Sequence, residues 1–242
     1  MNRFSVIIPA YNEERTLDVL LKKIADTPLP DTYEWEIIVV DDSSQDGTAR
    51  IISQWEQSDS LHIIGVSHTQ NYGKGHAIRT GLQHVSGTYT IIQDADLEYD
   101  PADMVRLLQH AISHNLSVVY GSRILGQRIA KQKKTASPYF YWGGRFVTLV
   151  TNLLYGLHLT DEPTCYKLFK TDLILSMSLK CERFEFCPEV TAKVARRGIP
   201  IPELPIKYSP RSKAEGKKIN WHDGMEAIYT LLRYRFCSSQ NI

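Results

Sequence analysis

Two aspartates separated by one residue, Asp94 and Asp96, directly follow an apolar run. Residues two apart in an extended segment project to the same side, so the two carboxylates can bind one hard divalent cation. Such a cation would keep coordination positions for diphosphate oxygens. Glu98 can supply a third oxygen ligand. The alternative is a solvated acidic turn before a helix that begins at Pro101, and the position after a predicted strand favours the metal site.

A second acidic pair, Asp41 and Asp42, also follows an apolar run. Carboxylates at this position can accept hydrogen bonds from a nucleobase or a ribose. The structural alternative is a helix cap, because Ser44 or Asp46 can accept from the first N–H groups of the helix that follows. We expect both: Asp41 and Asp42 functional, and Ser44 or Asp46 capping.

Residues 71–75 (NYGKG) combine two glycines with Lys74 before a predicted helix. A helix N-terminus favours anions, so this segment can hold a phosphate. The alternative is a tight turn, and the sequence leaves the two interpretations evenly balanced. Ile78 stands where a dinucleotide fingerprint needs its third glycine, and the chain contains no GxxxxGK[ST] sequence. Both of these phosphate-binding motifs are therefore excluded.

Basic side chains gather in the second half of the chain. Arg123 follows the fifth predicted strand, and two basic loops are predicted at residues 126–137 and 210–220. Their basic residues are Arg128, Lys131, Lys133 and Lys134 in the first loop and Arg211, Lys213, Lys217 and Lys218 in the second. A charge run is usually a solvated face. Two mobile basic loops also suit anionic substrates, one for each loop.

The elements that position these residues alternate between apolar runs and helical patterns. Strands are predicted at residues 4–8, 36–40, 61–66, 89–93 and 117–120, and helices at 13–24, 46–55, 75–85 and 101–114. Continuous apolar strands separated by helices predict a parallel sheet covered on both faces. Ligands of such sheets bind at the carboxyl ends of the strands. Residues 9–13, 41–44, 71–75 and 94–98 should therefore meet there.

The second half is less regular. Helices are predicted at residues 139–155, 185–197 and 223–235, and prolines at 200, 202 and 205 predict an edge strand within 201–208. The chain shows no repeat and no linker. We therefore predict one α/β domain over residues 1–242, with a mostly parallel, Rossmann-like sheet flanked by helices.

The composition of the chain limits the classes of function that it can have. The 242 residues are 43% hydrophobic with a formal net charge of +1, which argues against a nucleic-acid partner. Four cysteines form no CxxC pair, and we interpret them as reduced thiols of a cytosolic protein. The first residues lack a signal-peptide pattern. The apolar stretch at 139–157 is interrupted by Arg145, so no membrane-spanning segment is predicted.

Eight short segments together resemble the family 2 inverting glycosyltransferases, which have the GT-A fold. They are residues 8–13 (IPAYNE), 41–43 (DDS), 71–75 (NYGKG), 94–96 (DAD), 121–123 (GSR), 166–169 (YKLF), 205–208 (PIKY) and 216–219 (GKKI). Within that family the chain is most similar to dolichyl-phosphate mannose synthases and bacterial polyprenyl-phosphate glycosyltransferases. The resemblance covers most of the chain.

The resemblance implies a site for a nucleotide sugar such as GDP-mannose or a UDP-hexose. Its predicted binding residues are Pro9, Tyr11, Glu13, Asp41, Asp42, Lys74, Asp94, Ala95, Asp96, Arg211 and Lys217. Mg²⁺ or Mn²⁺ is expected on Asp94 and Asp96, with Glu98 assisting where relatives often have glutamine. Arg211 and residues 216–219 are expected to close over the diphosphate. Residues 1–122 then form the nucleotide-sugar-binding half, and residues 123–242 form the acceptor-binding half.

The acceptor is expected to be a polyprenyl phosphate, dolichyl or undecaprenyl. A hydroxyl acceptor needs a general base, for which Asp161 is the best candidate, whereas a phosphate is already an anion and needs cations. Arg123, Arg128 and Arg145 can position it. Asp94, Asp96, Arg123 and Asp161 are the predicted catalytic residues.

The competing hypotheses are transfer to a sugar hydroxyl of a glycan, nucleotidyl transfer, and a nucleotide-binding protein without catalysis. Intact Asp94 and Asp96 argue against the last. The helix at 139–155 is predicted to lie in the interface of an anionic bilayer, with an ordinary core helix as the alternative. We expect a peripheral protein on the cytoplasmic face of a membrane, and a membrane-protein partner that supplies an anchor.

Overall fold

The structure is a computed structural model that describes residues 1–58, 60–131, 138–211 and 221–236. Seven strands form one sheet in the order β3-β2-β1-β4-β6-β5-β7. Their bounds are β1 Asn2–Ala10, β2 Tyr33–Asp41, β3 His62–Ser67, β4 Tyr89–Ile92, β5 Val118–Ser122, β6 Lys167–Lys170 and β7 Glu203–Pro205. Only β6 runs antiparallel to its neighbours. A single α/β domain with a mostly parallel sheet is therefore confirmed.

The centre of the sheet is apolar because its strands are covered on both faces. β1 pairs with β2 in register from Asn2↔Tyr33 to Ala10↔Asp41, and with β4 on its other side. Its residues Val6, Ile7 and Ile8 are fully buried. A strand buried on both faces is a continuous apolar run without polar alternation. The polar residues that end each run therefore come out at one edge of the sheet.

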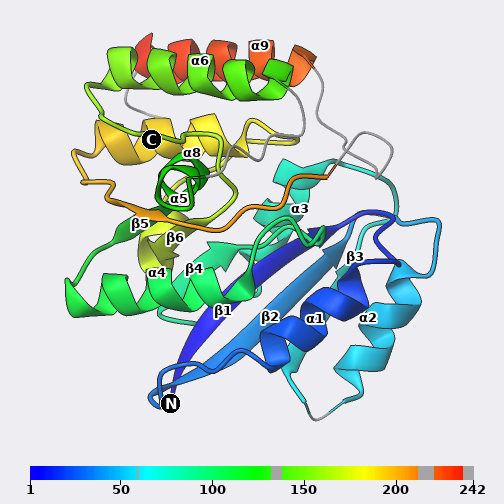
Figure 1. Ribbon diagram of the computed structural model, residues 1–242. Helices are drawn as coiled ribbons and strands as arrows, with labels where there is room; N and C mark the ends of the chain where they lie inside the picture. Colours follow the sequence, from blue (N-terminus) through cyan, green and yellow to red (C-terminus); the bar gives the residue numbers. More distant parts are fainter. Residues whose placement is uncertain (59, 132–137, 212–220, 237–242) are drawn as a thin grey trace.

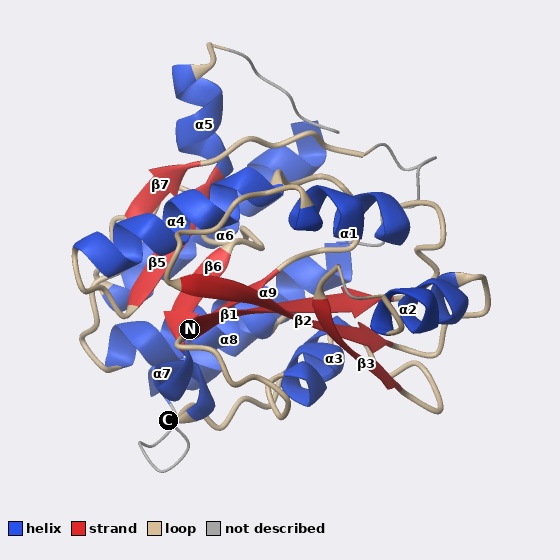
Figure 2. Ribbon diagram, turned by 90° about the horizontal axis from the view of Figure 1, so that it is seen from below, coloured by secondary structure: helices blue, strands red, loops and turns tan. Residues whose placement is uncertain are grey.

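Helices cover both faces of the sheet. Their bounds are α1 Leu17–Ala25, α2 Thr48–Glu56, α3 Lys74–Gly81, α4 Pro101–Ser113, α5 Arg123–Ile129, α6 Pro138–Tyr155, α7 Thr171–Leu175, α8 Phe186–Arg196 and α9 Trp221–Phe236. In the view from below, α1 and α4 lie on one face, and α3 and α8 on the other (Figure 2). Helices α6 and α9 lie side by side and form a further layer over α8 (Figure 1).

Three sequence predictions about the elements need correction. The predicted helix at 13–24 begins only at Leu17, and the one at 75–85 ends at Gly81. Strand β6 was not predicted, since its sequence KLFK has no strand pattern; it forms because β4 and β5 offer hydrogen-bonding edges on both sides. The proline-rich strand β7 does lie at the edge of the sheet, as predicted.

The first basic loop is partly helical. Residues 123–129 form α5, whose N-terminal cap is Ser122, with its Oγ accepting from Leu125 N–H at 3.1 Å. The basic charge and poor periodicity of residues 126–137 indicated a loop, but Gly126 lies within the helix, where a Cβ would stand 1.9 Å from the carbonyl oxygen of Ile206. Lys133 and Lys134 of this loop lie outside the described residues. In the described part of the chain, no helix has the length and apolarity needed to cross a bilayer.

Candidate active site

The turns that follow three parallel strands have left-handed backbone conformations. Asn12, Ser43 and Leu97 have φ values of 54°, 65° and 60°, and they follow β1, β2 and β4. Such values are uncommon outside glycine, above all for a bulky side chain such as leucine. The first two turns support each other, because Asn12 N–H donates to Ser44 Oγ and Asn12 Oδ1 accepts from Gln45 N–H. Strained backbone of this kind is concentrated at functional sites.

A cavity of about 1110 Å³ opens at this edge of the sheet. Eleven predicted site residues line it: Pro9, Tyr11, Glu13, Asp42, Lys74, Asp94, Ala95, Asp96, Glu98, Arg123 and Arg211. Four others, Asp41, Arg128, Arg145 and Asp161, stand outside the lining. Lys217 lies outside the described residues. The fold therefore gathers most of the residues that the sequence singled out.

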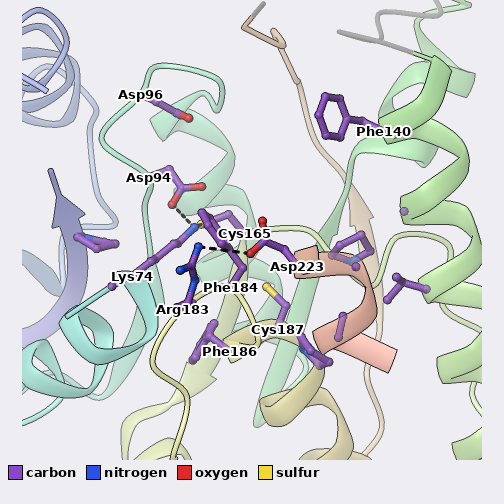
Figure 3. A pocket seen from close by; sticks show the side chains of 18 of the residues that line it. Lys74, Asp94, Asp96, Phe140, Cys165, Arg183, Phe184, Phe186, Cys187 and Asp223 are labelled. Carbon is purple, nitrogen blue, oxygen red and sulfur yellow. Dashed lines mark hydrogen bonds and ion pairs between the residues drawn. The ribbon is translucent and has the colours of Figure 1, made fainter. Parts of the chain in front are cut away.

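The aspartates of the DAD sequence face cations of the protein itself. Lys74 Nζ forms an ion pair with Asp94 Oδ1 (Figure 3). Arg211 Nη2 lies 2.8 Å from Asp96 Oδ2, and Arg211 Nη1 lies 3.3 Å from Glu13 Oε2. The segment is a turn and not the extended stretch that the sequence predicted. Both carboxylates nevertheless reach the same cavity.

The electrostatics of this acidic cluster are unfavourable without a further cation. Burial, reinforced by the charges of Asp94 and Glu98, raises the pKa of Asp96 to about 7, although Arg211 acts in the opposite direction. Burial acts to lower the pKa of Lys74, but Asp94 outweighs it and leaves this pKa raised. A divalent cation would relieve the repulsion between the carboxylates, so the donor set fits Mg²⁺ or Mn²⁺.

Both carboxylate oxygens of Glu98, the expected third metal ligand, accept hydrogen bonds from other groups of the protein. Its Oε2 accepts from the hydroxyl of Tyr208 at 2.7 Å, and its Oε1 accepts from Arg211 N–H at 2.7 Å. Among the described residues, no three His, Cys, Asp or Glu side chains converge as a metal site. The geometry therefore offers Asp94 and Asp96 as protein ligands, and Glu98 instead fixes the backbone of Arg211 over the cavity.

The NYGKG turn is held by a carboxylate of the protein. Asp42 accepts from the N–H groups of Tyr72 at 2.9 Å and Gly73 at 2.7 Å, and its Oδ1 lies 2.7 Å from His68 Nδ1. Two backbone donors of this segment are thus already paired within the protein. Their pairing favours the tight-turn alternative for Tyr72 and Gly73, while the Lys74 side chain points to the site. His68 was missed, because a lone histidine carries no spacing signal.

The glycines of this turn permit a close backbone contact. Gly73 has φ 97°, and a Cβ there would stand 2.5 Å from Glu182 O. A Cβ at Gly75 would stand 2.8 Å from Arg183 O. The N–H of His76, in the first turn of α3, donates to Glu182 O at 2.9 Å. A loop from the second half of the chain therefore sits directly on the turn that presents Lys74.

Asp41 and Asp46, two further acidic residues considered in the sequence, accept hydrogen bonds from nearby backbone N–H groups. Asp41 Oδ1 accepts from Ser44 N–H at 3.0 Å. The expected cap at Ser44 or Asp46 needs correction, because Gly47 occupies the cap position of α2 without a side-chain cap. Asp46 Oδ1 accepts from the N–H of Thr48, the first residue of the helix, from one position before the cap.

The carboxylate of Asp161 makes three hydrogen bonds with Arg123. Its carboxylate accepts from the backbone N–H, Nε and Nη2 of Arg123 at 2.8, 2.7 and 2.7 Å. Burial acts to raise the pKa of Asp161, but the charge and hydrogen bonds of Arg123 outweigh it and leave this pKa lowered. A lowered pKa and a saturated carboxylate do not suit a general base, so the structure argues against that role.

The three arginines expected to hold an acceptor phosphate do not converge. Arg145 Nη1 donates to the carbonyl oxygen of Thr160 at 2.8 Å, and Arg128 is exposed near the end of α5. Arg123 reaches the cavity, but it is paired with Asp161. Of the three, only Arg123 lines the cavity, so this grouping is corrected.

Several lining residues were missed because they come from distant segments without motifs. They are Cys165 after Pro163, Arg183 and Phe184 before α8, and Trp221 and Asp223 at the start of α9. Cys165 Sγ lies 3.9 Å from Lys74 Nζ, and burial raises the pKa of its thiol. Only the tertiary fold brings these residues to the site.

The comparison with protein families defines the class of protein. The family model for glycosyl transferase family 2 matches residues 5–175, so the chain belongs to this family. A relative from Edwardsiella ictaluri, an undecaprenyl-phosphate 4-deoxy-4-formamido-L-arabinose transferase, is 29% identical over 88% of this chain and 62% of its own. The relative of the same description from Salmonella choleraesuis is 28% identical over 90% and 63%. The chain spans about three fifths of the length of these relatives.

Solved structures confirm the GT-A fold. The chain is similar to glucosyl-3-phosphoglycerate synthase from Mycobacterium tuberculosis in complex with Mn²⁺, UDP and phosphoglyceric acid, with a TM-score of 0.68 and 20% identity over 99% of this chain and 80% of that one. It is also similar to S. aureus TarS 1–349 in complex with UDP-GlcNAc, with a TM-score of 0.60 and 18% identity over 97% and 72%.

Proposed function

We propose that this chain transfers a sugar from a nucleotide-sugar donor to the phosphate of a polyprenyl phosphate. The observation that carries the proposal is the two-sided lining of one cavity. Asp94 and Asp96 stand on one side of the cavity, the donor end, and Phe140 of α6 stands across from them, at the acceptor end (Figure 3). Trp142 of α6 and Trp221 of α9 also line the cavity. A charged end beside an aromatic end suits a reaction between a nucleotide sugar and an amphipathic acceptor.

Asp94 and Asp96 would hold Mg²⁺ or Mn²⁺, and the metal would neutralise charge on the departing nucleoside diphosphate. Lys74 and Arg211, which pair with these carboxylates, would then turn to diphosphate oxygens. The buried Nε of Arg211 has no hydrogen-bond partner in the described structure. A planar guanidinium with a spare donor suits a phosphate oxygen, because it can grip two oxygens at once.

A phosphate acceptor needs no general base, and this agrees with the pairing of Asp161 in the structure. The sugar is displaced from its diphosphate by an oxygen that is already anionic, so no proton has to be removed. Asp161, the base candidate from the sequence, is saturated by Arg123. Relatives named for transfer to undecaprenyl phosphate align over most of this chain and support the proposed acceptor.

A second candidate function is transfer to a sugar hydroxyl, and Glu162 favours it. This fully buried residue lines the cavity, its Oε2 has no partner in the described structure, and its Oε1 accepts from Thr191 Oγ1 at 3.0 Å. Burial raises the pKa of Glu162. A carboxylate with a free oxygen and a raised pKa has the properties of a general base.

The proposal includes contact with a membrane surface through α6 and α9. The two helices expose ten large hydrophobic residues: Tyr139, Trp142, Phe146, Leu149, Leu153, Trp221, Met225, Tyr229, Leu232 and Phe236. Their buried sides pack on each other through Val147, Ala227 and Leu231. Exposed aromatic faces with Arg233 and Arg235 in the last turn of α9 suit the interface of an anionic bilayer. The cytoplasmic face and a membrane-protein anchor stay predictions.

The test is product analysis with radiolabelled donors. GDP-mannose, UDP-glucose and UDP-N-acetylglucosamine are each incubated with undecaprenyl phosphate and Mn²⁺, and the label is extracted into organic solvent. We expect one donor to deliver label to the organic phase, with none delivered to undecaprenol. If label instead enters a water-soluble glycan and Glu162→Gln abolishes that transfer, the second candidate function is correct.

A further inference from the structure

The loop before α8 presents one arginine to the cavity from a fixed backbone. Glu185 accepts from the N–H groups of Glu182 at 2.5 Å and Arg183 at 2.9 Å. The same loop is held against the NYGKG turn through its contacts with Gly73 and His76. Because both sides of the loop are anchored, the Cα of Arg183 is fixed while its long side chain keeps its freedom.

Arg183 has the loosest pairing among the cavity-lining cations. Its Nη2 lies 3.8 Å from Asp223 Oδ1, beyond hydrogen-bond distance, and its side chain is 58% exposed. The ion pairs that Lys74, Arg123 and Arg211 make with aspartates are 2.8 Å or shorter. Within the described residues, Arg183 is therefore the lining cation that can change partners at the smallest cost.

Arg183 also stands at the junction between the two ends of the cavity. Its loop carries Phe184, whose ring lies 6.0 Å from Lys74 Nζ at the donor end. Its ion-pair partner Asp223 belongs to the first turn of α9, which also contributes Trp221 to the cavity lining. Figure 3 shows the Lys74–Asp94 and Arg183–Asp223 pairs facing the same cavity. A headgroup that enters along α9 would meet Arg183 before it meets the donor.

We propose that Arg183 binds the phosphate monoester of the acceptor and exchanges Asp223 for it. This inference rests on the proposed transfer to a polyprenyl phosphate. An arginine grips a phosphate with two parallel N–H donors, and such charge-assisted bonds are stronger than a stretched ion pair. Asp223 is almost fully buried, and its ion pair with Arg183 keeps the guanidinium beside the cavity until a phosphate replaces it. The pair therefore both attracts the phosphate and sets its distance from α9.

The experiment measures initial rates with undecaprenyl phosphate and with the short, water-soluble farnesyl phosphate. Arg183→Ala should raise the acceptor KM roughly tenfold for both acceptors, because the lost contact is to the shared phosphate. The donor KM and the slow hydrolysis of donor without acceptor should not change. Arg183→Lys should restore part of the affinity, since it keeps the charge but loses the bidentate geometry.

Two further variants separate binding from folding and from bulk charge. Arg106→Ala removes the same charge from a side chain that is 51% exposed and outside the cavity lining, and it should leave the acceptor KM unchanged. Asp223→Asn removes the carboxylate that competes with the acceptor, and it should lower the acceptor KM. Melting curves of the Arg183 variants should match the wild type, because the Arg183 side chain is 58% exposed.

The outcomes distinguish this inference from the proposed function. If the wild type transfers sugar to both phosphates and Arg183→Ala keeps the wild-type acceptor KM, the inference is wrong and the proposed function stands. A rise with undecaprenyl phosphate alone would mean that Arg183 recognises the chain and not the phosphate, which also overturns it. If the wild type transfers sugar to no phosphate, the proposed function fails first, and with it the inference.

Discussion

The two ends of the cavity differ in their side chains: those of one end are held in ion pairs, and those of the other are exposed aromatic rings. At the donor end each aspartate of the DAD sequence already faces a cation of the protein, Lys74 or Arg211. At the acceptor end, aromatic side chains of α6 and α9 such as Trp142 and Trp221 are more than half exposed. Under the proposed function, the donor end would exchange one set of charges for another, whereas the acceptor end would be covered from outside.

The largest effect is expected at the donor end. Asp96→Asn removes a charge that would hold the metal, so transfer should fall roughly 10³-fold, as for other losses of charge stabilisation in a transition state. The fold should survive, because the lost charge repels Asp94 and Glu98. Rates with Mn²⁺ and with EDTA measure this. Full activity of the variant, or of the wild type in EDTA, would show that transfer does not need a metal on Asp96.

The Arg123–Asp161 pair should matter for stability more than for chemistry. Asp161→Asn leaves a largely buried guanidinium without its counter-charge, which costs about 3–5 kcal/mol of unfolding free energy. Because the pKa of Asp161 is lowered in the folded state, its contribution is complete above the unfolded pKa of about 4 and is lost as the pH falls through the folded pKa. Denaturant titrations at pH 7 and pH 3 should therefore show a smaller difference from the wild type at pH 3. A stable variant with abolished turnover would restore Asp161 as a base.

Arg211 is expected to contribute next. Arg211→Ala removes the cation that touches Asp96 and Glu13 and should lower kcat/KM about 10²-fold, since one charge-assisted contact to the leaving group is lost. Arg211→Lys should recover only part of this, because lysine offers a point charge. Trypsin cleavage of the peptide bond after Arg211 should also be slower when donor and Mn²⁺ are present. Equal cleavage with and without donor would end the case for closure over the diphosphate.

The sequence predicted the site better where the signal was local. Asp94 and Asp96 follow a buried strand, and a parallel sheet must deliver them to its carboxyl edge. In contrast, Arg183 and Asp223 lie forty residues apart and meet only because α8 and α9 pack together. Gly126 gave no sign of its role either, because its close contact with the Ile206 backbone depends on a segment eighty residues away. Pairwise contacts between distant segments leave no periodic trace in one sequence.

The smallest effect concerns the aromatic face. Replacing Trp142 and Trp221 together with serine removes two exposed rings, so binding to vesicles of phosphatidylglycerol should weaken about tenfold. Donor hydrolysis without acceptor should stay unchanged, because the change is confined to the acceptor end. Flotation at low salt measures the binding. If wild type and variant both stay fully in solution, the interfacial role of α6 and α9 is wrong.

The central claim is a bond between the sugar and the acceptor phosphate, and one spectrum tests it. The donor that proves active is prepared with ¹³C at the anomeric carbon and incubated with farnesyl phosphate and Mn²⁺. The account predicts a product whose anomeric carbon couples to the single phosphorus of the acceptor. In the reaction that lacks metal, the anomeric carbon should stay coupled to the diphosphate of the unreacted donor. An anomeric carbon bonded through oxygen to carbon, with no phosphorus coupling, would contradict it.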